Sequence, residues 1–78
     1  MSRPSSTHGI KVLRYLRMKK KFSQSKLGKL SGIPQPVISL YEHGLEIPEG
    51  HRQALWAVLK DKSFTPESLD QIWIHMGG

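Results

Sequence analysis

Hydrophobic residues recur at intervals of three and four positions along most of this chain. In residues 10–20 such spacing predicts an amphipathic helix that packs one face against a core and leaves its lysines on the other face. The positions that share the inner face are Ile10, Leu13, Leu16 and Arg17. Residues 1–9 have too little apolar surface to pack, so we expect a flexible arm there and a folded domain at residues 10–78.

Two short helices joined by a tight turn are predicted next. Ser23 is a suitable N-cap for a helix over residues 24–30. The inward positions of that helix are Leu27, Gly28 and Leu30. Gly32 ends it, because glycine adopts the left-handed conformation that a sharp turn needs. Pro34 then favours the first turn of another helix, which runs to about His43.

The helix that follows the turn has distinct inner and outer faces. Ile38 and Tyr41 are its inward positions. The positions left on or near the outside are Gln35, Pro36, Ser39 and Leu40. Pro36 is compatible with this helix, because a proline in the first turn removes only an amide that has no partner within the helix.

The last third of the chain predicts two more helices. One begins after Pro48 and ends near Lys60, and its buried positions are Ala54, Leu55, Val58 and Leu59. Thr65 and Pro66 then suit the start of a final helix, in which apolar residues follow at helical spacing. These residues are Leu69, Ile72, Trp73 and Met76. Ile72, Ile74 and Met76 also alternate as they do in a strand, but we favour the helix, which makes the chain a compact all-α domain of five helices.

Charge divides the chain into two unlike halves. The net charge is +6, but residues 1–41 hold nine Lys or Arg and no acid, whereas residues 42–78 hold three basic and six acidic residues. An asymmetry of this kind in a small domain indicates a surface that faces a polyanion, either nucleic acid or an anionic membrane. A basic face that is merely solvated has the same composition, so charge alone does not decide between them.

Composition limits the cross-links, metal sites and cellular compartment that we expect for this protein. There is no cysteine, so neither a disulfide framework nor a thiolate metal site is expected. The N-terminal stretch lacks the apolar segment of a signal peptide, and no apolar run is long enough to cross a bilayer. We therefore expect a cytoplasmic protein without a membrane partner.

The residues from Phe22 to Gly44 carry a specific pattern. The stretch reads FSQSKLGKLSGIPQPVISLYEHG, with Ser-Gln and Leu opening the first helix, Gly at the turn and Ile-Ser-x-x-Glu-x-Gly closing the second helix. It resembles the lambda-repressor/Cro-like family of helix-turn-helix transcriptional regulators, also called XRE-type, and the resemblance extends from Leu13 to about Leu59. Gly28 departs from the family, which usually has alanine there. The resemblance implies a domain that sets its second motif helix in the major groove.

Base contacts are implied for the outer face of that helix. The matching positions are Gln35, Pro36, Ser39 and Leu40. A glutamine bonds adenine through both its carbonyl and its amide, and apolar side chains contact the methyl group of thymine. The resemblance therefore implies a half-site rich in A·T pairs.

Phosphate contacts are implied at the start of the preceding helix and after the recognition helix. The matching residues are Gln24, Ser25, Lys26 and His43, and Lys19 and Lys20 are candidates from the first helix. Free amides and the helix dipole favour an anion near Gln24. A run of lysines is also common on a solvated surface, which leaves the role of Lys19 and Lys20 open.

Arg17 and Glu42 match a buried ion pair of the family, and their implied role is structural, because a lone buried carboxylate is costly. A dimer is expected as well, since one recognition helix reads too few bases for useful specificity. Candidate residues for the dimer surface are Ile47, Leu55, Trp56 and Trp73. Apolar residues at helical spacing more often belong to a core, so each of the four has that alternative.

The predicted function is sequence-specific binding of double-stranded DNA by a homodimer that regulates transcription, most simply as a repressor. The alternative is a protein-interaction module whose main partner is a protein, such as a toxin. An enzyme is the least favoured class, because the histidines have neither ligand nor triad spacing and the chain has no glycine-rich phosphate loop. We expect no cofactor and no metal.

Overall fold

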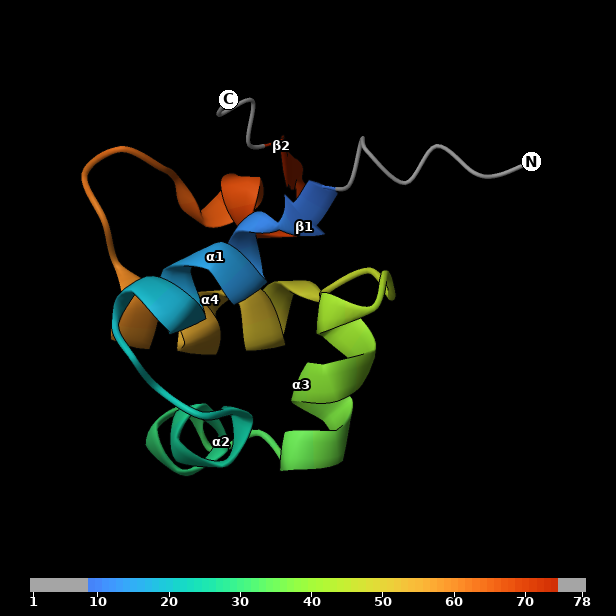
Figure 1. The fold of residues 1–78 in the computed structure, drawn as a ribbon. Coiled ribbons are helices and arrows are strands. Elements are labelled where there is room, and N and C mark those ends of the chain that lie inside the picture. The colour runs from blue at the N-terminus through green and yellow to red at the C-terminus, as the bar shows by residue number, and fades with distance from the viewer. Residues whose placement is uncertain (1–8, 75–78) are drawn as a thin grey trace.

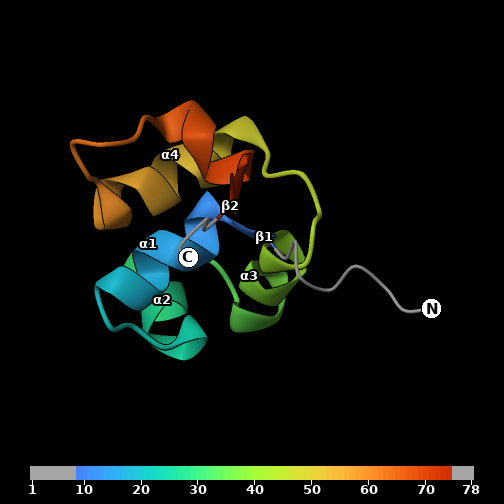
Figure 2. The same ribbon diagram turned by 45° about the horizontal axis from the view of Figure 1, so that its top comes forward.

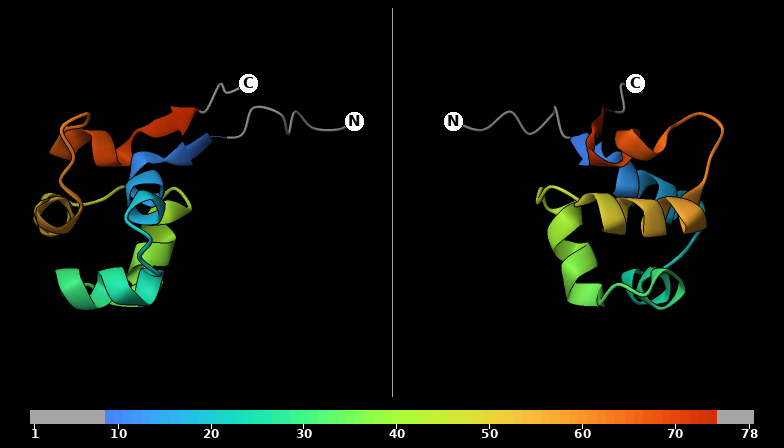
Figure 3. Two further views of the ribbon diagram at one scale, coloured as in Figure 1. Left: turned by 60° about the vertical axis from the view of Figure 1, so that its left-hand side comes forward. Right: turned by 180° about the vertical axis from the view of Figure 1, so that it is seen from behind.

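The computed structural model describes residues 9–74, and at residues 73 and 74 it describes the backbone alone. In chain order the elements of this part are β1 (Gly9–Lys11), α1 (Val12–Lys19), α2 (Gln24–Ser31), α3 (Gln35–Glu42), α4 (Glu49–Leu59), the 3-10 helix η2 (Pro66–Asp70) and β2 (Ile72–Ile74). α1 and α4 lie at the centre, with α3 upright beside them and α2 below (Figure 1). The strands and α2 lie at opposite ends of the molecule (Figure 3).

A hydrophobic core joins all of the helices. Its residues are Val12, Leu13, Leu16, Leu27, Ile33, Ile38, Tyr41, Ile47, Leu55, Leu59 and Leu69, none more than 3% exposed. α2 packs on α3 and α4, and η2 packs on α1 and α4, so that α4 and η2 lie on one side and α2 and α3 on the other (Figure 2). The inward positions predicted for α3, Ile38 and Tyr41, are confirmed.

The inward position predicted for Leu30 is wrong, and for Ile47 and Leu55 the core alternative to a dimer surface holds. Leu30 is 49% exposed, because α2 turns Leu27 and Gly28 toward the core and leaves Leu30 beside them. Ile47 and Leu55 are 1% and 0% exposed, so neither has surface left to contribute to a dimer interface. Both residues stabilise the domain itself.

The start of the domain is a strand, where the apolar spacing predicts a helix from Ile10. Gly9–Lys11 pairs antiparallel with β2, and Ile10 lies opposite Trp73. α1 therefore begins at Val12, whose amide donates to the carbonyl of Gln71 at 2.9 Å. Of the arm predicted at residues 1–9, only Gly9 lies within the described residues, and it belongs to the sheet.

The helix predicted after Thr65 is wrong beyond its first turns. Thr65 caps a 3-10 helix together with Ser68, and that helix ends at Asp70, after Leu69 has entered the core. Residues 72–74 form β2. The described chain therefore has four α-helices, one 3-10 helix and a two-stranded sheet, and the all-α domain of five helices is corrected to a mostly helical one.

No helix within residues 9–74 is both long enough and apolar enough to span a bilayer.

Candidate nucleic-acid interface

α2 and the turn after it approach each other closely because Gly28 has no side chain. A Cβ atom at this position would lie 2.8 Å from the carbonyl oxygen of Ile33. Gly32 reverses the chain with a φ of +79°, and its amide donates to the carbonyl of Gly28 at 2.8 Å. The N-cap of α2 is Ser23, whose hydroxyl accepts from the amide of Lys26 at 2.9 Å. These contacts build a helix, a tight turn and a second helix, which is the arrangement that enters the major groove of DNA.

The outer face of α3 is open to solvent. Gln35, Pro36 and Leu40 are exposed, and Ser39 is partly exposed. Leu40 keeps 54% of its surface in water, although Ile38 on the opposite face is fully buried. The structure thus brings the four residues predicted to contact bases onto the accessible side of one helix.

An ion pair anchors the C-terminal end of α3 to α1. The Arg17 guanidinium donates from Nε to Glu42 Oε2 at 2.5 Å and from Nη2 to Oε1 at 3.1 Å. Its Nη1 donates to the carbonyl of Phe22 at 2.8 Å, which also holds the chain that leads into α2. The Glu42 side chain is 3% exposed, so its charge depends on these partners.

Gln24 and Gln35 extend this ion pair into a chain of hydrogen bonds. Gln24 Nε2 donates to Glu42 Oε1 at 2.9 Å, and Gln35 Nε2 donates to Gln24 Oε1 at 2.7 Å. A carboxylate only accepts hydrogen bonds, so the Gln24 amide group must face Glu42 and its carbonyl must face Gln35. The orientation of Gln35 is therefore fixed, with its carbonyl oxygen and one amide hydrogen free for another partner.

The histidine after α3 has a defined tautomer. His43 Nδ1 lies 2.7 Å from the backbone carbonyl of Ser39, and since a carbonyl only accepts, Nδ1 carries the hydrogen. The other ring nitrogen, Nε2, then donates to a phosphate only in the imidazolium form.

Tyr41 joins α3 to α4. Its hydroxyl lies 2.6 Å from His51 Nδ1, and the rings meet edge to face. Burial, and then the negative charge of Asp70, raise the pKa of Tyr41, so the hydroxyl keeps its proton, and the tautomer of His51 decides which of the two atoms donates. This contact fixes the inner side of α3 while its outer side stays open.

Some basic side chains of the described residues form ion pairs with carboxylates, and others form none. Lys19 pairs with Asp61 at 3.0 Å, and this hydrogen bond and charge raise the pKa of Lys19. Within residues 9–74 the exposed lysines that form no ion pair include Lys20, Lys21, Lys26 and Lys29. Lys20 and Lys26 are therefore free to meet an anion, whereas Lys19 already has a carboxylate partner.

Lys11 and Asp70 hold the loop after α3, and sequence reasoning missed this role. Lys11 is 4% exposed and donates to Asp70 at 2.8 Å and to the carbonyl of Leu45 at 2.9 Å. Asp70 also accepts from the amide of Ile47 at 3.0 Å and lies 3.4 Å from Arg52. No local signal distinguishes Lys11 from the surface lysines, because its partners lie more than thirty residues away.

Titratable side chains in the described part of the chain form no group of three that is arranged to hold a metal ion.

A comparison with protein families places this arrangement in a known group. The family model described as "Helix-turn-helix" matches residues 13–52, which is about half of the chain and includes nearly all of α1, the whole of α2 and α3, and the start of α4. Comparisons with curated proteins and with solved structures found no match.

Proposed function

This chain belongs to the XRE/lambda-repressor-like helix-turn-helix family, and we propose that it is a dimeric repressor that binds a palindromic operator through α3. DNA binding by a regulator of the XRE kind follows from the family. Our proposal goes beyond the family in two respects, namely that the protein represses transcription and that it binds DNA as a dimer.

The observation that carries the proposal is the fixed orientation of Gln35. Its free carbonyl oxygen accepts a hydrogen bond, and its second amide hydrogen donates one. In the major groove, adenine offers a donor at N6 and an acceptor at N7, which match these two groups. Since the side chain is already oriented by Gln24, docking on adenine costs little additional ordering.

The rest of the outer face favours an A·T-rich half-site. Pro36 and Leu40 are apolar and exposed, and the methyl group of thymine is the apolar feature of the major groove. Ser39 serves as donor or acceptor beside them. We expect Pro36 and Leu40 to select thymine methyls next to the adenine that Gln35 contacts.

Phosphate groups beside the half-site are the second set of contacts. Gln24 retains one amide hydrogen after its bond to Glu42, and it stands in the first turn of α2, where the helix dipole attracts anions. Ser25, Lys26 and Lys20 are exposed nearby in the sequence. His43 joins them in its charged form.

A dimer supplies the second half-site. Recognition helices related by a two-fold axis read half-sites about 10 base pairs apart. Of the predicted interface residues, Trp56 packs partly against the core and keeps some exposed surface. The side chain of Trp73 lies outside the described residues, although its backbone belongs to β2. These two tryptophans remain our candidates for the contact between subunits.

The experiment that tests the recognition face compares Gln35→Ala with Gln53→Ala. Gln53 is exposed on α4, where it bonds Glu49 at 3.0 Å, and serves as the matched control. We expect Gln35→Ala to lose about 1–3 kcal/mol of binding free energy on the preferred duplex and to relax base preference at one position of each half-site. Gln53→Ala should bind as the parent does. Unchanged base preference in Gln35→Ala contradicts the assignment.

A protein-interaction module is the second candidate. Met18, Leu30, Leu45 and Ile72 are about half exposed and lie outside α3, so apolar surface is present away from the proposed DNA face. Copurification of a partner chain, together with DNA affinity that shows no sequence preference, favours this second function over the first.

A further inference from the structure

A pair of opposite charges, Lys11 and Asp70, binds the loop that follows α3. Lys11 Nζ donates to Asp70 Oδ1 at 2.8 Å and to the carbonyl oxygen of Leu45 at 2.9 Å. Asp70 Oδ1 in turn accepts from the backbone amide of Ile47 at 3.0 Å. The Lys11 side chain is 5% exposed, so its ammonium group depends on these acceptors. The pair therefore fixes two backbone positions of the loop.

Leu45 connects this pair to the last turn of α3. Its amide donates to the carbonyl oxygen of Leu40 at 3.0 Å, and between them Gly44 turns the chain with a φ of +122°. Leu45 is 52% exposed, so packing of its side chain contributes little to holding the loop in place. The backbone of Leu45 therefore links the end of the recognition helix to Lys11.

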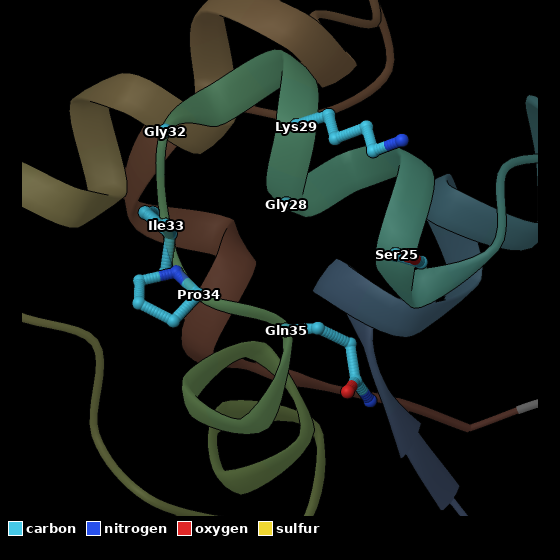
Figure 4. Close-up of a pocket in the computed structure, with 7 residues that line it drawn as sticks. All are labelled: Ser25, Gly28, Lys29, Gly32, Ile33, Pro34 and Gln35. Carbon is cyan, nitrogen blue, oxygen red and sulfur yellow. The ribbon is translucent and has the colours of Figure 1, made fainter.

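Both ends of α3 are held in this way, by different parts of the chain. Gln35 lies where the turn from α2 enters the helix (Figure 4), and it is bonded to α2. The other end of α3 points toward the sheet (Figure 1). That end is held by the Arg17–Glu42 pair, and through the loop by Lys11 and Asp70.

Neither Lys11 nor Asp70 belongs to the part of the chain that matches the helix-turn-helix family. The match covers residues 13–52, whereas Lys11 precedes it in β1 and Asp70 follows it at the end of η2. Pairing of β1 with β2 places Lys11 opposite Ile72, two residues after Asp70, and so brings the two charges together. The support for the end of α3 is therefore a feature of this chain outside the family motif.

We propose that Lys11 and Asp70 are positioning residues for DNA recognition, which hold the C-terminal half of α3 at the angle where Leu40 meets its base. This inference rests on the proposed function, because it concerns the same duplex. Lys11 is too deeply buried to reach a phosphate itself. Its effect passes through Leu45 to the turn of α3 that carries Leu40. Gln35, at the other end of the helix, is held separately by α2.

The proposal predicts a loss of base preference at one end of each half-site. A cation that only attracts phosphate weakens every duplex alike, so its removal leaves base preference unchanged. Removal of a positioning contact instead lets the last turn of α3 move, and the base opposite Leu40 is then selected less strongly. The pattern of base preference therefore separates positioning from simple charge attraction.

The test compares Lys11→Met with Val58→Ala. Methionine keeps an apolar chain of similar length but removes both hydrogen bonds that Lys11 donates. Asp70 still has Arg52 as a partner at 3.4 Å, so its carboxylate is not left alone. Val58 packs against the core from α4, and Val58→Ala lowers stability without removing a bond to the loop. Melting by circular dichroism sets an assay temperature at which the variants are folded.

Affinity is then measured on the selected duplex and on each of its single-base variants. Lys11→Met should reduce discrimination about tenfold at the position that Leu40→Ala relaxes. The position that Gln35→Ala relaxes should keep the discrimination of the parent, and Val58→Ala should resemble the parent at both positions. If Lys11→Met does not fold, Asp70→Asn replaces it, because asparagine keeps an acceptor oxygen for Ile47 and removes the charge that holds Lys11.

Hydrogen exchange of the free protein, followed by NMR, tests the same link without DNA. The amide of Leu45, which donates to Leu40, should exchange about tenfold faster in Lys11→Met than in Val58→Ala. Equal exchange in the two variants, or unchanged base preference in the folded variant of the pair, overturns the inference while the proposed function stands. A parent protein that prefers no sequence contradicts both.

Equal loss of discrimination at the two positions also overturns the inference, because it indicates a general loosening of the domain. Selective loss at the position that Leu40 reads, together with faster exchange of the Leu45 amide, supports it.

Discussion

The Arg17–Glu42 pair is the residue-scale feature on which the shape of the recognition surface depends. Glu42→Gln removes the charge opposite Arg17 and should lower the free energy of unfolding by about 3–5 kcal/mol, because a mostly buried guanidinium loses its partner. Urea unfolding followed by tryptophan fluorescence measures this. The control is Arg14→Met, an exposed residue of α1 without an ion pair among the described residues, which should change stability by less than about 0.5 kcal/mol. Equal stability of the two variants contradicts the assigned role.

Asp61 makes the free energy of unfolding depend on pH in the acid range. It accepts from the amide of Ser63 at 2.9 Å and from Lys19 at 3.0 Å, and these two donors hold its pKa below the ordinary 3.8. The folded state therefore favours the carboxylate, and this contribution is present above pH 3.8 and lost as pH falls through the lowered pKa. The difference in Tm between the parent and Asp61→Asn should be present at pH 7 and disappear in acid. A difference that stays constant down to pH 2 contradicts this explanation.

Single positions differ in how well the sequence predicts them. Helical spacing alone places Ile38 inside and Leu40 outside, because the facing of a helical residue follows from its position in the turn. The contact between Gln24 and Gln35 does not follow from spacing, since it requires the angle between two helices. For the same reason the burial of Lys11, which depends on Asp70, has no local signal.

At the scale of elements, Gly28 decides how closely α2 and the turn approach. Gly28→Ala improves helix propensity by about 1 kcal/mol, but its Cβ would lie 2.8 Å from the Ile33 carbonyl, so the backbone must shift. We expect a net loss of about 1–3 kcal/mol in unfolding free energy, as for other overpacked sites. Gly50→Ala in α4 is the control, because a Cβ added there would meet no atom within 4 Å apart from its chain neighbours and the backbone of its own helix. A stability of Gly28→Ala equal to or above that of the parent contradicts the packing argument.

The helices at the centre of the chain were predictable as elements, and the ends were not. Ser23 and Gly32 mark the limits of α2 by local chemistry, through a capping hydroxyl and a left-handed φ. β1 and β2 form by pairing with each other, although some sixty residues separate them in the sequence. The alternating pattern of each strand is too short to outweigh the helical spacing of the same residues in a prediction from sequence. Helical spacing therefore favours a helix at both ends, although the alternation of Ile72 and Ile74 also permits a strand.

Across the whole molecule, acids of the second half pair with cations of the first half. Lys11, Arg17 and Lys19 are engaged by Asp70, Glu42 and Asp61, respectively. Part of the charge asymmetry therefore ties the domain together and is unavailable to a polyanion. Composition gives the total charge but does not show which cations are free, since pairing depends on the fold.

The measurement that tests the central claim most directly is selection of bound duplexes from a random DNA pool at near-physiological salt. The account predicts recovery of an inverted repeat whose A·T-rich half-sites lie about one helical turn, ~10 base pairs, apart. Selection with Gln35→Ala should then relax one position in each half-site. A folded parent protein that enriches no sequence contradicts operator recognition by α3.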